Sequence, residues 1–420
     1  MSTRCRLYLS SLSAFVCLFA CASIASAQHE PATGGGTIGG GSTGRSSTKP
    51  ATKPASNKPA TTTTPVNRPT TTRRTSPASS RKPTTSTAST TTPATTPTTS
   101  NNATASAYYQ QGEARYNAKQ YKEALESYLK AVQINPSMSS ALYRIGWIYN
   151  DLEDYESAVD PLKRVVAMQP SNAAAYFELG YANKKLDRLT EALSAFQQAI
   201  RNKPDYAGAH YQIGWIHNER KNYEDAITSL KSALSYRAAY PEAHNELGYA
   251  LRNLGRYSEA IEEYQEAIKL NPDLALAHLG LGDVYYYNTK EYPKAASAYK
   301  RGLDLKPDNA QAFYNLGWCY NDLERYNEAI ESLRSAIRLQ AVYAEAYNEI
   351  GYALHQMRRY GEAIQQYQTA IRQKANYASA HYNLGVSYIS LNNRNAALEQ
   401  YRILQRIDNA RATKLFNQIK

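Results

Sequence analysis

Small residues recur every 34 positions from residue 105 onward, always in the same register. The glycines of the series are Gly112, Gly146, Gly180, Gly214, Gly248, Gly282, Gly317, Gly351 and Gly385. The alanines are Ala124, Ala158, Ala192, Ala226, Ala260, Ala295, Ala329, Ala363 and Ala397. Because a glycine inside a helix costs about 1 kcal/mol relative to alanine, nine of them indicate a helix contact too close for a Cβ atom. The pattern predicts nine repeats over 105–411, each with a glycine-bearing first helix and an alanine-bearing second helix, and only the sixth, 275–309, has an extra residue.

The first helix of each repeat is predicted to carry two different stripes. When each repeat is numbered so that its glycine is position 8, positions 4, 7, 8 and 11 share one arc of a helical wheel and hold the apolar core residues. Positions 5, 9, 12 and 13 lie about 145° away on the same wheel. The chain has three tryptophans, and Trp147, Trp215 and Trp318 all occupy position 9. We therefore predict that they are not core residues of their own helix pair.

The stripe opposite the core repeats one chemistry in the second, fourth and seventh repeats. Position 5 holds Tyr143, Tyr211 and Tyr314, position 12 holds Asn150, Asn218 and Asn321, and position 13 holds Asp151, Glu219 and Asp322. In the repeat that follows each of these, position 9 is Tyr181, Tyr249 or Tyr352, and position 6 is Glu178, Glu246 or Glu349. We predict an exposed aromatic and amide-rich face that binds an extended peptide, with rings on apolar side chains and Asn paired with the peptide backbone. In the alternative, each Trp stacks on its own Tyr one turn earlier and on the neighbouring repeat; the two roles can coexist.

The repeat resembles the tetratricopeptide repeat, whose pattern is aromatic–x2–Leu–Gly–x2–Tyr, then Ala–x3–aromatic–x2–Ala, then Pro. The fifth repeat carries it as Leu247, Gly248, Ala260, Tyr264, Ala267 and Pro272. The prolines expected to end the second helix are Pro136, Pro170, Pro204, Pro272 and Pro307. The resemblance covers 105–411 and implies an all-α solenoid, a right-handed superhelix of helix-turn-helix pairs whose first helices line a concave groove. Residues 412–420 are expected to form a capping helix.

A longer period overlies the short one. Repeats four to six, 207–309, resemble repeats seven to nine, 310–411, in order: a Gly-Trp repeat, a Gly-Tyr repeat and a third type. Repeats two and three form a Gly-Trp and Gly-Tyr pair without the third member. The array is expected to have grown by duplication of a block, which carries any binding unit with it. Family members that clamp a C-terminal carboxylate use Lys and Asn at positions 5 and 9; Tyr and Trp stand here, so that clamp is absent.

The first 104 residues differ in composition from the repeats. Residues 1–27 match a secretory signal, with Arg4 and Arg6 before an apolar stretch and a small-residue cleavage site ending at Ala27. An uncleaved anchor and lipidation at Cys21 remain open, because residues 18–21 resemble a bacterial lipobox. Residues 28–104 are rich in Thr, Pro and Ser, and we expect a disordered basic linker. The protein is therefore predicted to be exported: periplasmic, cell-surface or secreted, with membrane attachment only through Cys21 or the uncleaved signal.

Charge and motif content argue against nucleic-acid binding, metal binding and catalysis. The net charge of +12 arises mostly before residue 105, since 105–420 holds 37 basic and 35 acidic residues, so no nucleic-acid partner is expected. The position-4 histidines, which are His210, His244, His278 and His381, belong to different repeats and cannot share a metal. No catalytic or cofactor motif is present, and Cys319 is expected to be a buried thiol.

We therefore predict a non-enzymatic scaffold that binds an extended or disordered protein segment in the groove. The alternative is glycan or cell-wall binding through the aromatic rings. A further hypothesis is that the basic residues of 45–82 dock in the groove of their own or a neighbouring molecule. The oligomeric state and the partner's identity are left open.

Overall fold

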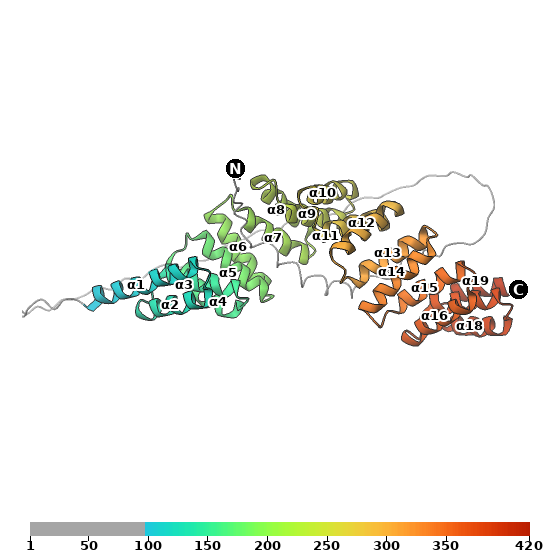
Figure 1. Cartoon of the computed structure of the whole chain (residues 1–420). Coiled ribbons are helices and arrows are strands. Elements are labelled where there is room, and N and C mark those ends of the chain that lie inside the picture. The colour runs from blue at the N-terminus through green and yellow to red at the C-terminus, as the bar shows by residue number, and fades with distance from the viewer. Residues whose placement is uncertain (1–96) are drawn as a thin grey trace, which may run out of the picture. The chain divides into compact units, whose positions relative to one another are not determined.

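The chain folds as an all-α array of helix pairs. The computed structural model describes residues 97–420, which lie within one compact unit, Ser89–Lys420. Over these residues there are nineteen α-helices, one π-helix and no strand, and consecutive helices pack against each other in chain order (Figure 1). The expected signal and the linker up to residue 96 lie outside the described residues. Among residues 97–420, no helix combines the length and the apolarity that crossing a membrane requires.

The helices pair two by two from the N-terminal end, and α19 remains as a single last helix. Their bounds are α1 (Pro97–Asn117), α2 (Tyr121–Ile134), α3 (Ser139–Asp151), α4 (Tyr155–Met168), α5 (Ala173–Lys185), α6 (Leu189–Asn202), α7 (Ala207–Glu219), α8 (Tyr223–Tyr236), α9 (Pro241–Asn253), α10 (Tyr257–Leu270), α11 (Ala275–Asp283) with η1 (Val284–Thr289), α12 (Tyr292–Leu305), α13 (Ala310–Asp322), α14 (Tyr326–Leu339), α15 (Ala344–Gln356), α16 (Tyr360–Gln373), α17 (Ala378–Ser390), α18 (Arg394–Ile407) and α19 (Asn409–Ile419). Each of the five prolines predicted to end a second helix lies two residues after the end of that helix.

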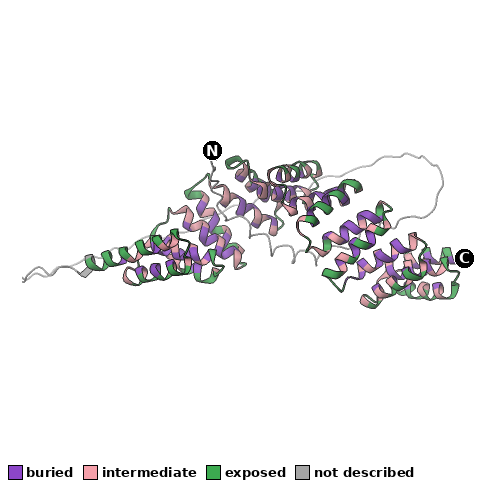
Figure 2. Cartoon of the chain, viewed as in Figure 1, coloured by how far each residue is buried: buried purple, intermediate pink, exposed green. Residues whose placement is uncertain are grey.

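The position-8 glycines fix how closely the two helices of a pair approach. A Cβ atom on Gly146 would lie 2.4 Å from Cγ of Leu162, and one on Gly317 would lie 2.5 Å from Cγ of Leu333. Gly248 is less tightly enclosed, with Tyr264 atoms at 3.1 Å. The predicted contact without room for a Cβ is therefore confirmed. Buried residues follow the sides of the helices that face one another (Figure 2).

A left-handed residue follows the first helix in every repeat. Its φ angle is positive at Lys119, Glu153, Asp187, Lys221, Gly255, Lys290, Glu324, Arg358 and Asn392. This left-handed residue stands at position 15 of eight repeats and at position 16 of the sixth, which has the extra residue. A single residue in this conformation ends a helix and turns the chain back. The recurring turn explains why the repeat length varies so little.

The extra residue of the sixth repeat is absorbed by a π-helical turn. α11 continues directly into η1, and Lys290 then takes the left-handed conformation at φ 58°. A π turn holds one more residue than an α turn, so the insertion lengthens the first helix without displacing the second. The sequence located the insertion in this repeat but did not predict its form.

Both ends of the array differ from the expected boundaries. α1 begins at Pro97, so residues 97–104, which we assigned to the disordered linker, are helical. They extend the first helix of the first repeat, and Asn102 accepts a hydrogen bond from the amide of Asn135 at 3.1 Å. α19 begins at Asn409, three residues before the expected capping helix. A Cβ atom on Gly385 would lie 2.5 Å from Cδ2 of Leu415 in α19, so α19 packs closely against α17, the first helix of the ninth repeat.

Candidate functional site

The aromatic residues at position 9 lie between neighbouring first helices and remain partly exposed. Trp147 is on α3, Trp215 on α7 and Trp318 on α13, and each has an intermediate exposure. The position-9 tyrosines Tyr181, Tyr249 and Tyr352 also have intermediate exposure. Direct helix contacts join α3 with α5, α7 with α9 and α13 with α15. Each tryptophan is therefore followed, on the adjoining first helix, by a tyrosine in the same position.

Every tryptophan rests on the position-12 side chain of the preceding repeat. The ring of Trp147 lies 5.3 Å from that of Tyr116, and the ring of Trp318 lies 5.8 Å from that of Tyr286. At Trp215 the neighbour is a cation, with Nζ of Lys184 3.5 Å from the ring centroid. The alternative in which tryptophans stack on the neighbouring repeat thus describes all three. Stacking on the Tyr one turn earlier is seen between Trp318 and Tyr314, whose centroids are 5.6 Å apart.

The predicted exposure of the position-5 tyrosines was wrong for two of them. Tyr211 is 6% exposed and Tyr314 is 8% exposed, whereas Tyr143 is partly exposed. The reason is the tyrosine that directly precedes the next first helix: Tyr240, before α9, packs 5.0 Å from Tyr211, and Tyr343, before α15, packs 5.1 Å from Tyr314, centroid to centroid. These rings contribute to the contact between repeats.

The position-12 asparagines are also buried, which corrects the prediction that they face solvent. Asn150, Asn218 and Asn321 are 6%, 3% and 4% exposed. Nδ2 of Asn150 donates to the backbone oxygen of Glu178 at 3.0 Å and to its carboxylate at 2.9 Å. Asn218 makes the same pair of bonds to Glu246, at 3.0 and 2.9 Å, and Asn321 to Glu349, both at 3.3 Å. Each amide therefore joins two first helices instead of pairing with a ligand backbone.

The acids of the stripe fall into two groups. Asp151 and Asp322 are exposed and Glu219 is partly exposed, while Glu178 is buried and Glu246 and Glu349 keep partial exposure. Burial raises the pKa of Glu178 and of Glu349 to about 7 and also raises the pKa of Glu246, and the asparagine bonds oppose that rise. Glu178 and Glu349 are therefore only partly ionised at neutral pH.

Two basic residues of the stripe already have partners. Lys184 is 7% exposed, and its Nζ donates to Oε1 of Gln212 at 2.7 Å. Arg252 pairs with Asp283, which stands at position 9 of the sixth repeat and also accepts a hydrogen bond from Tyr299 at 2.7 Å. Asp283 interrupts the aromatic series between Tyr249 and Trp318. Lys184 and Gln212 were absent from the predicted site. They stand at position 12 and at position 6 of the next repeat, 28 residues apart, as each Asn and its Glu do, and this shared spacing would have indicated them.

We use the name tryptophan face for the side chains at positions 9 and 13 of α3, α7 and α13, together with the position-6 and position-9 side chains of α5, α9 and α15. It contains nine of the fifteen predicted site residues: Trp147, Asp151, Tyr181, Trp215, Glu219, Tyr249, Trp318, Asp322 and Tyr352. Three more, Asn150, Asn218 and Asn321, are buried beneath it. The exposed groups it offers are ring surfaces and carboxylates.

The position-4 histidines have a structural role. Nε2 of His210 donates to the backbone oxygen of Pro204 at 2.8 Å, and that of His278 donates to Pro272 at 2.9 Å. His244 and His381 bond the oxygens of Ala238 and Ala375 in the same way, at 3.1 and 2.9 Å. Because a carbonyl only accepts, this nitrogen carries the proton. Across residues 97–420, His, Cys, Asp and Glu side chains form no group of three that could hold a metal ion.

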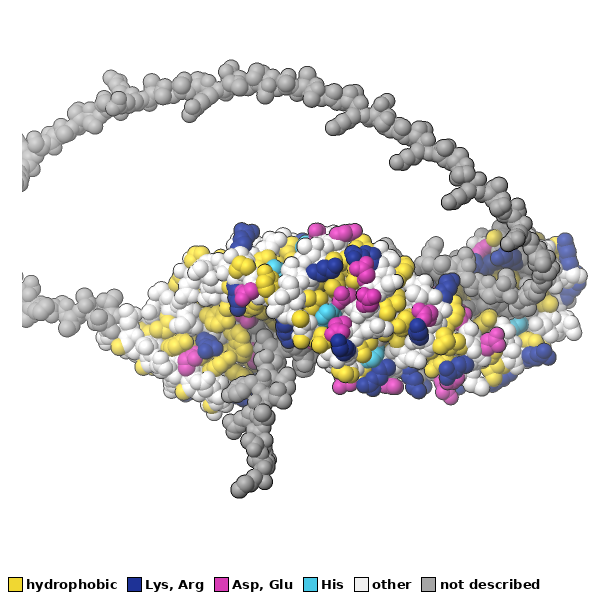
Figure 3. All heavy atoms as spheres, turned by 90° about the horizontal axis from the view of Figure 1, so that it is seen from above, with side chains coloured by type: hydrophobic (Ala, Val, Ile, Leu, Met, Phe, Trp, Pro, Cys, Tyr) yellow, Lys and Arg dark blue, Asp and Glu magenta, His cyan; other side chains and the backbone are white. Residues whose placement is uncertain are grey.

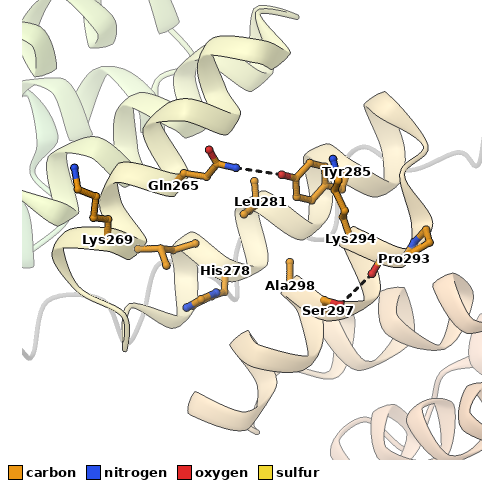
Figure 4. A pocket seen from close by; sticks show the side chains of 10 residues that line it. Gln265, Lys269, His278, Leu281, Tyr285, Pro293, Lys294, Ser297 and Ala298 are labelled. Atoms are coloured by element: carbon orange, nitrogen blue, oxygen red, sulfur yellow. Dashed lines mark hydrogen bonds between the residues drawn. The ribbon is translucent and has the colours of Figure 1, made fainter.

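Two hollows lie away from the tryptophan face. The larger, of about 610 Å³, is bounded by α10, α11, η1 and α12, and Gln265 donates to the hydroxyl of Tyr285 across it (Figure 4). Its two lysines, Lys269 and Lys294, are paired with Glu266 and Glu291. The smaller, of about 540 Å³, is bounded by α12, α13 and α14. On the face shown in Figure 3, basic and acidic side chains are intermixed.

Family models match most of the repeat array. A model described as a TPR repeat matches residues 214–255, 248–288 and 359–392. Models described as tetratricopeptide repeat match residues 143–207 and 279–344, 105–138, and 378–411. A comparison with curated protein sequences finds no match.

Solved structures with similar helix pairs cover smaller parts of the chain. MamA is 26% identical over 41% of this chain and 94% of that chain, with a TM-score of 0.38. YrrB, whose title calls it a TPR protein with an unusual peptide-binding site, is 23% identical over 48% of this chain and 100% of that chain, with a TM-score of 0.39. The pilF protein of Pseudomonas aeruginosa is 21% identical over 50% of this chain and 97% of that chain, with a TM-score of 0.43.

Proposed function

The chain belongs to the tetratricopeptide repeat family, and on that premise we propose that it is a non-enzymatic scaffold that binds an extended protein segment along the tryptophan face. The observation that carries the proposal is the series of six partly exposed aromatic rings at position 9, one on each of six first helices. Large rings held at a fixed spacing offer contact area at low conformational cost.

The way these rings are held favours binding over a purely structural role. Each tryptophan packs on Tyr116, Lys184 or Tyr286 and still keeps an intermediate exposure. The ring is therefore ordered before a ligand arrives, which lowers the entropy lost on binding. Apolar side chains or prolines of a partner segment can pack on the accessible part.

The contacts to a ligand's polar groups differ from those first predicted. Because Asn150, Asn218 and Asn321 are committed to the helices of the next repeat, they do not read the ligand backbone. Oδ2 of Asp322 already accepts a hydrogen bond from the hydroxyl of Tyr286 at 2.7 Å. Its other oxygen, the exposed carboxylate of Asp151 and the partly exposed Glu219 remain to accept hydrogen bonds from a ligand. A ligand for this face therefore presents hydrogen-bond donors next to its apolar groups.

The proposal is tested by applying the full-length chain to an array of extended peptides and to an array of glycans. We expect peptides to bind and the combined Trp147→Ala, Trp215→Ala and Trp318→Ala variant to lose that binding. The matched control is Tyr236→Ala, on the second helix α8, whose side chain is 51% exposed and lies outside the tryptophan face. Binding to glycans alone, lost in the same variant, would replace the proposal by sugar stacking on the same rings. Equal peptide binding by both variants would refute it.

We further propose that the scaffold acts outside the cytoplasm. The support is the sequence of residues 1–27, with its basic start, apolar centre and Ala27. Mass spectrometry of the mature N-terminus decides between the forms: a chain starting at Gln28 indicates a cleaved signal, and a lipid-modified Cys21 indicates membrane attachment. An intact Met1 on protein from the cytoplasm would contradict export.

A further inference from the structure

The three Gly-Trp repeats each place two acids close together where they meet the next repeat. We call these places the first, middle and third junctions. The pairs are Asp151 with Glu178, Glu219 with Glu246 and Asp322 with Glu349. In each pair the position-13 acid directly follows the Asn that donates to the carboxylate of the Glu, and its charge adds to the rise in the pKa of the Glu that burial causes. Like charges at short range repel, so each junction favours a cation nearby.

The middle junction contains such a cation from the chain itself. Lys184, at position 12 of the third repeat, holds its Nζ 3.5 Å from the centroid of Trp215. Burial raises the pKa of Glu219 and of Glu246, and the ammonium of Lys184 opposes the rise in both. A tryptophan ring, two carboxyls and an ammonium thus occur together, an arrangement that stabilises a cation by ring and charge together.

The first and third junctions have the same tryptophan and acids but a different position-12 residue. Tyr116 stands at that place before Trp147, and Tyr286 before Trp318. At the first junction two cations pack on rings and not on the acids of the junction: Arg144 pairs with Glu113 and lies 4.4 Å from the ring of Tyr116, and Nζ of Lys185 lies 5.7 Å from the ring of Tyr181. At the third junction Lys290 attracts Asp322. No buried lysine takes the place of Lys184 in either.

A buried acceptor adds to the demand for a donor. Oδ1 of Asn150 and of Asn321 has no hydrogen-bond partner among the described residues, and both side chains are more than nine-tenths buried against the Glu of their junction. Oδ1 of Asn218 is in the same state. The buried amide oxygen is common to the three junctions and does not distinguish them; what differs is the ammonium of Lys184, which lies at the middle junction and has no counterpart at position 12 of the other two.

We propose that the first and third junctions each bind the ammonium or guanidinium group of a Lys or Arg side chain from the partner segment, whereas the middle junction is filled by the chain's own Lys184. The exposed Asp151 and Asp322 make the first contact, beside the partly exposed rings of Trp147 and Trp318. This inference rests on the proposed function and names the class of segment: extended, with at least two basic residues. Residues 45–82 of the chain carry nine Lys and Arg among prolines and threonines, so the chain itself contains a segment of this class.

The three tryptophans allow each junction to be observed separately in the full-length chain. Variants that keep one tryptophan, with the other two changed to Phe, are titrated with a peptide of sequence 45–82 while the emission is recorded. The matched control peptide has Gln in place of every Lys and Arg. We expect saturable changes for the Trp147-only and Trp318-only chains with the basic peptide, little change with the Gln peptide, and little change for the Trp215-only chain.

Two substitutions sharpen the assignment. Asp151→Asn in the Trp147-only chain is expected to weaken binding about fivefold, whereas Asp160→Asn, an exposed aspartate on α4, leaves it unchanged. Lys184→Tyr gives the middle junction the position-12 residue of the other two, so Trp215 should begin to respond. Circular dichroism confirms that each variant is folded. Equal responses at Trp215 and Trp147, or equal binding of both peptides, would overturn the proposal.

A final arm identifies the source of the cations and separates this inference from the proposed function. Replacing the nine basic residues of 45–82 by Gln in the chain should raise its affinity for the added basic peptide if its own segment occupies the junctions; an unchanged affinity assigns them to a separate protein. Peptides that bind the tryptophan face regardless of charge would contradict the cation sites and leave the scaffold standing. Failure of every peptide to bind would contradict both.

Discussion

The two stripes of each first helix follow different rules. The stripe around position 8 keeps its glycine in all nine repeats; in eight of them the second helix of the pair is pressed against that glycine, and in the ninth α19 takes this place. The stripe at positions 9, 12 and 13 changes from repeat to repeat. Tryptophan packs on tyrosine at the first junction and on lysine at the middle junction, and Arg252 pairs with Asp283 where the fifth repeat meets the sixth. The first stripe sets the geometry within a pair. The second sets both the contact between repeats and the chemistry open to a partner, so specificity is expected to lie there.

The largest effect is expected from adding one carbon to a glycine of the position-8 stripe, compared with a glycine outside both stripes. Gly146→Ala would place a Cβ 2.4 Å from Cγ of Leu162, and we expect a loss of about 3 kcal/mol in unfolding free energy. Gly361, in α16, has no atom within 4 Å of an added Cβ, so Gly361→Ala should be neutral or stabilise by up to about 1 kcal/mol. Urea unfolding followed by circular dichroism measures both. If the two variants were equally stable, the account of the glycine stripe would be wrong.

The next test concerns the amides that join repeats. Asn150→Ala leaves the backbone oxygen and carboxyl of Glu178 without their shared donor, and we expect a loss of about 2 kcal/mol. Asn253→Ala is the control, since Asn253 is exposed and bonds only within its own helix, to the oxygen of Tyr249. Its change should stay below about 0.5 kcal/mol. Similar losses for both would show that the buried amides do not hold the junctions together.

A smaller effect is expected from pH. The pKa of Glu178 is about 7 in the folded chain, above the value of an exposed Glu, so the folded state binds the proton more tightly. The resulting stability is complete at low pH and is lost as the pH rises through 7. Between pH 6 and 8 the loss is about 1 kcal/mol for this group. Thermal unfolding of the wild type and of Glu178→Gln over this range checks it: the variant should lose less, and a wild type that gains stability relative to the variant would contradict the sign.

The sequence predicted the parts of this fold that depend on a single helix pair. The period, the close glycine contact, the turn prolines and the buried Cys319 follow from residues that act within one repeat. A helical wheel shows which side of a helix faces away from its own pair, but it does not show what the end of the repeat and the next first helix place there. For that reason Asn150, Asn218, Asn321, Tyr211 and Tyr314 were expected at the surface and are buried. The helical start at Pro97 was also missed, because residues 97–104 have the composition of the linker.

The most direct test of the central claim is to map where a bound segment lies. A photoreactive amino acid replaces Tyr181, Tyr249 or Tyr352 in the full-length chain, one at a time, and Tyr236 on α8 serves as the site outside the tryptophan face. The chain is cross-linked to a peptide that bound it in the peptide-array experiment, and mass spectrometry identifies which residue of the peptide each position contacts. The account predicts cross-links from the three position-9 sites in an order along the peptide that follows the order of the repeats. Cross-links chiefly from position 236, or contacts in no consistent order, would contradict it.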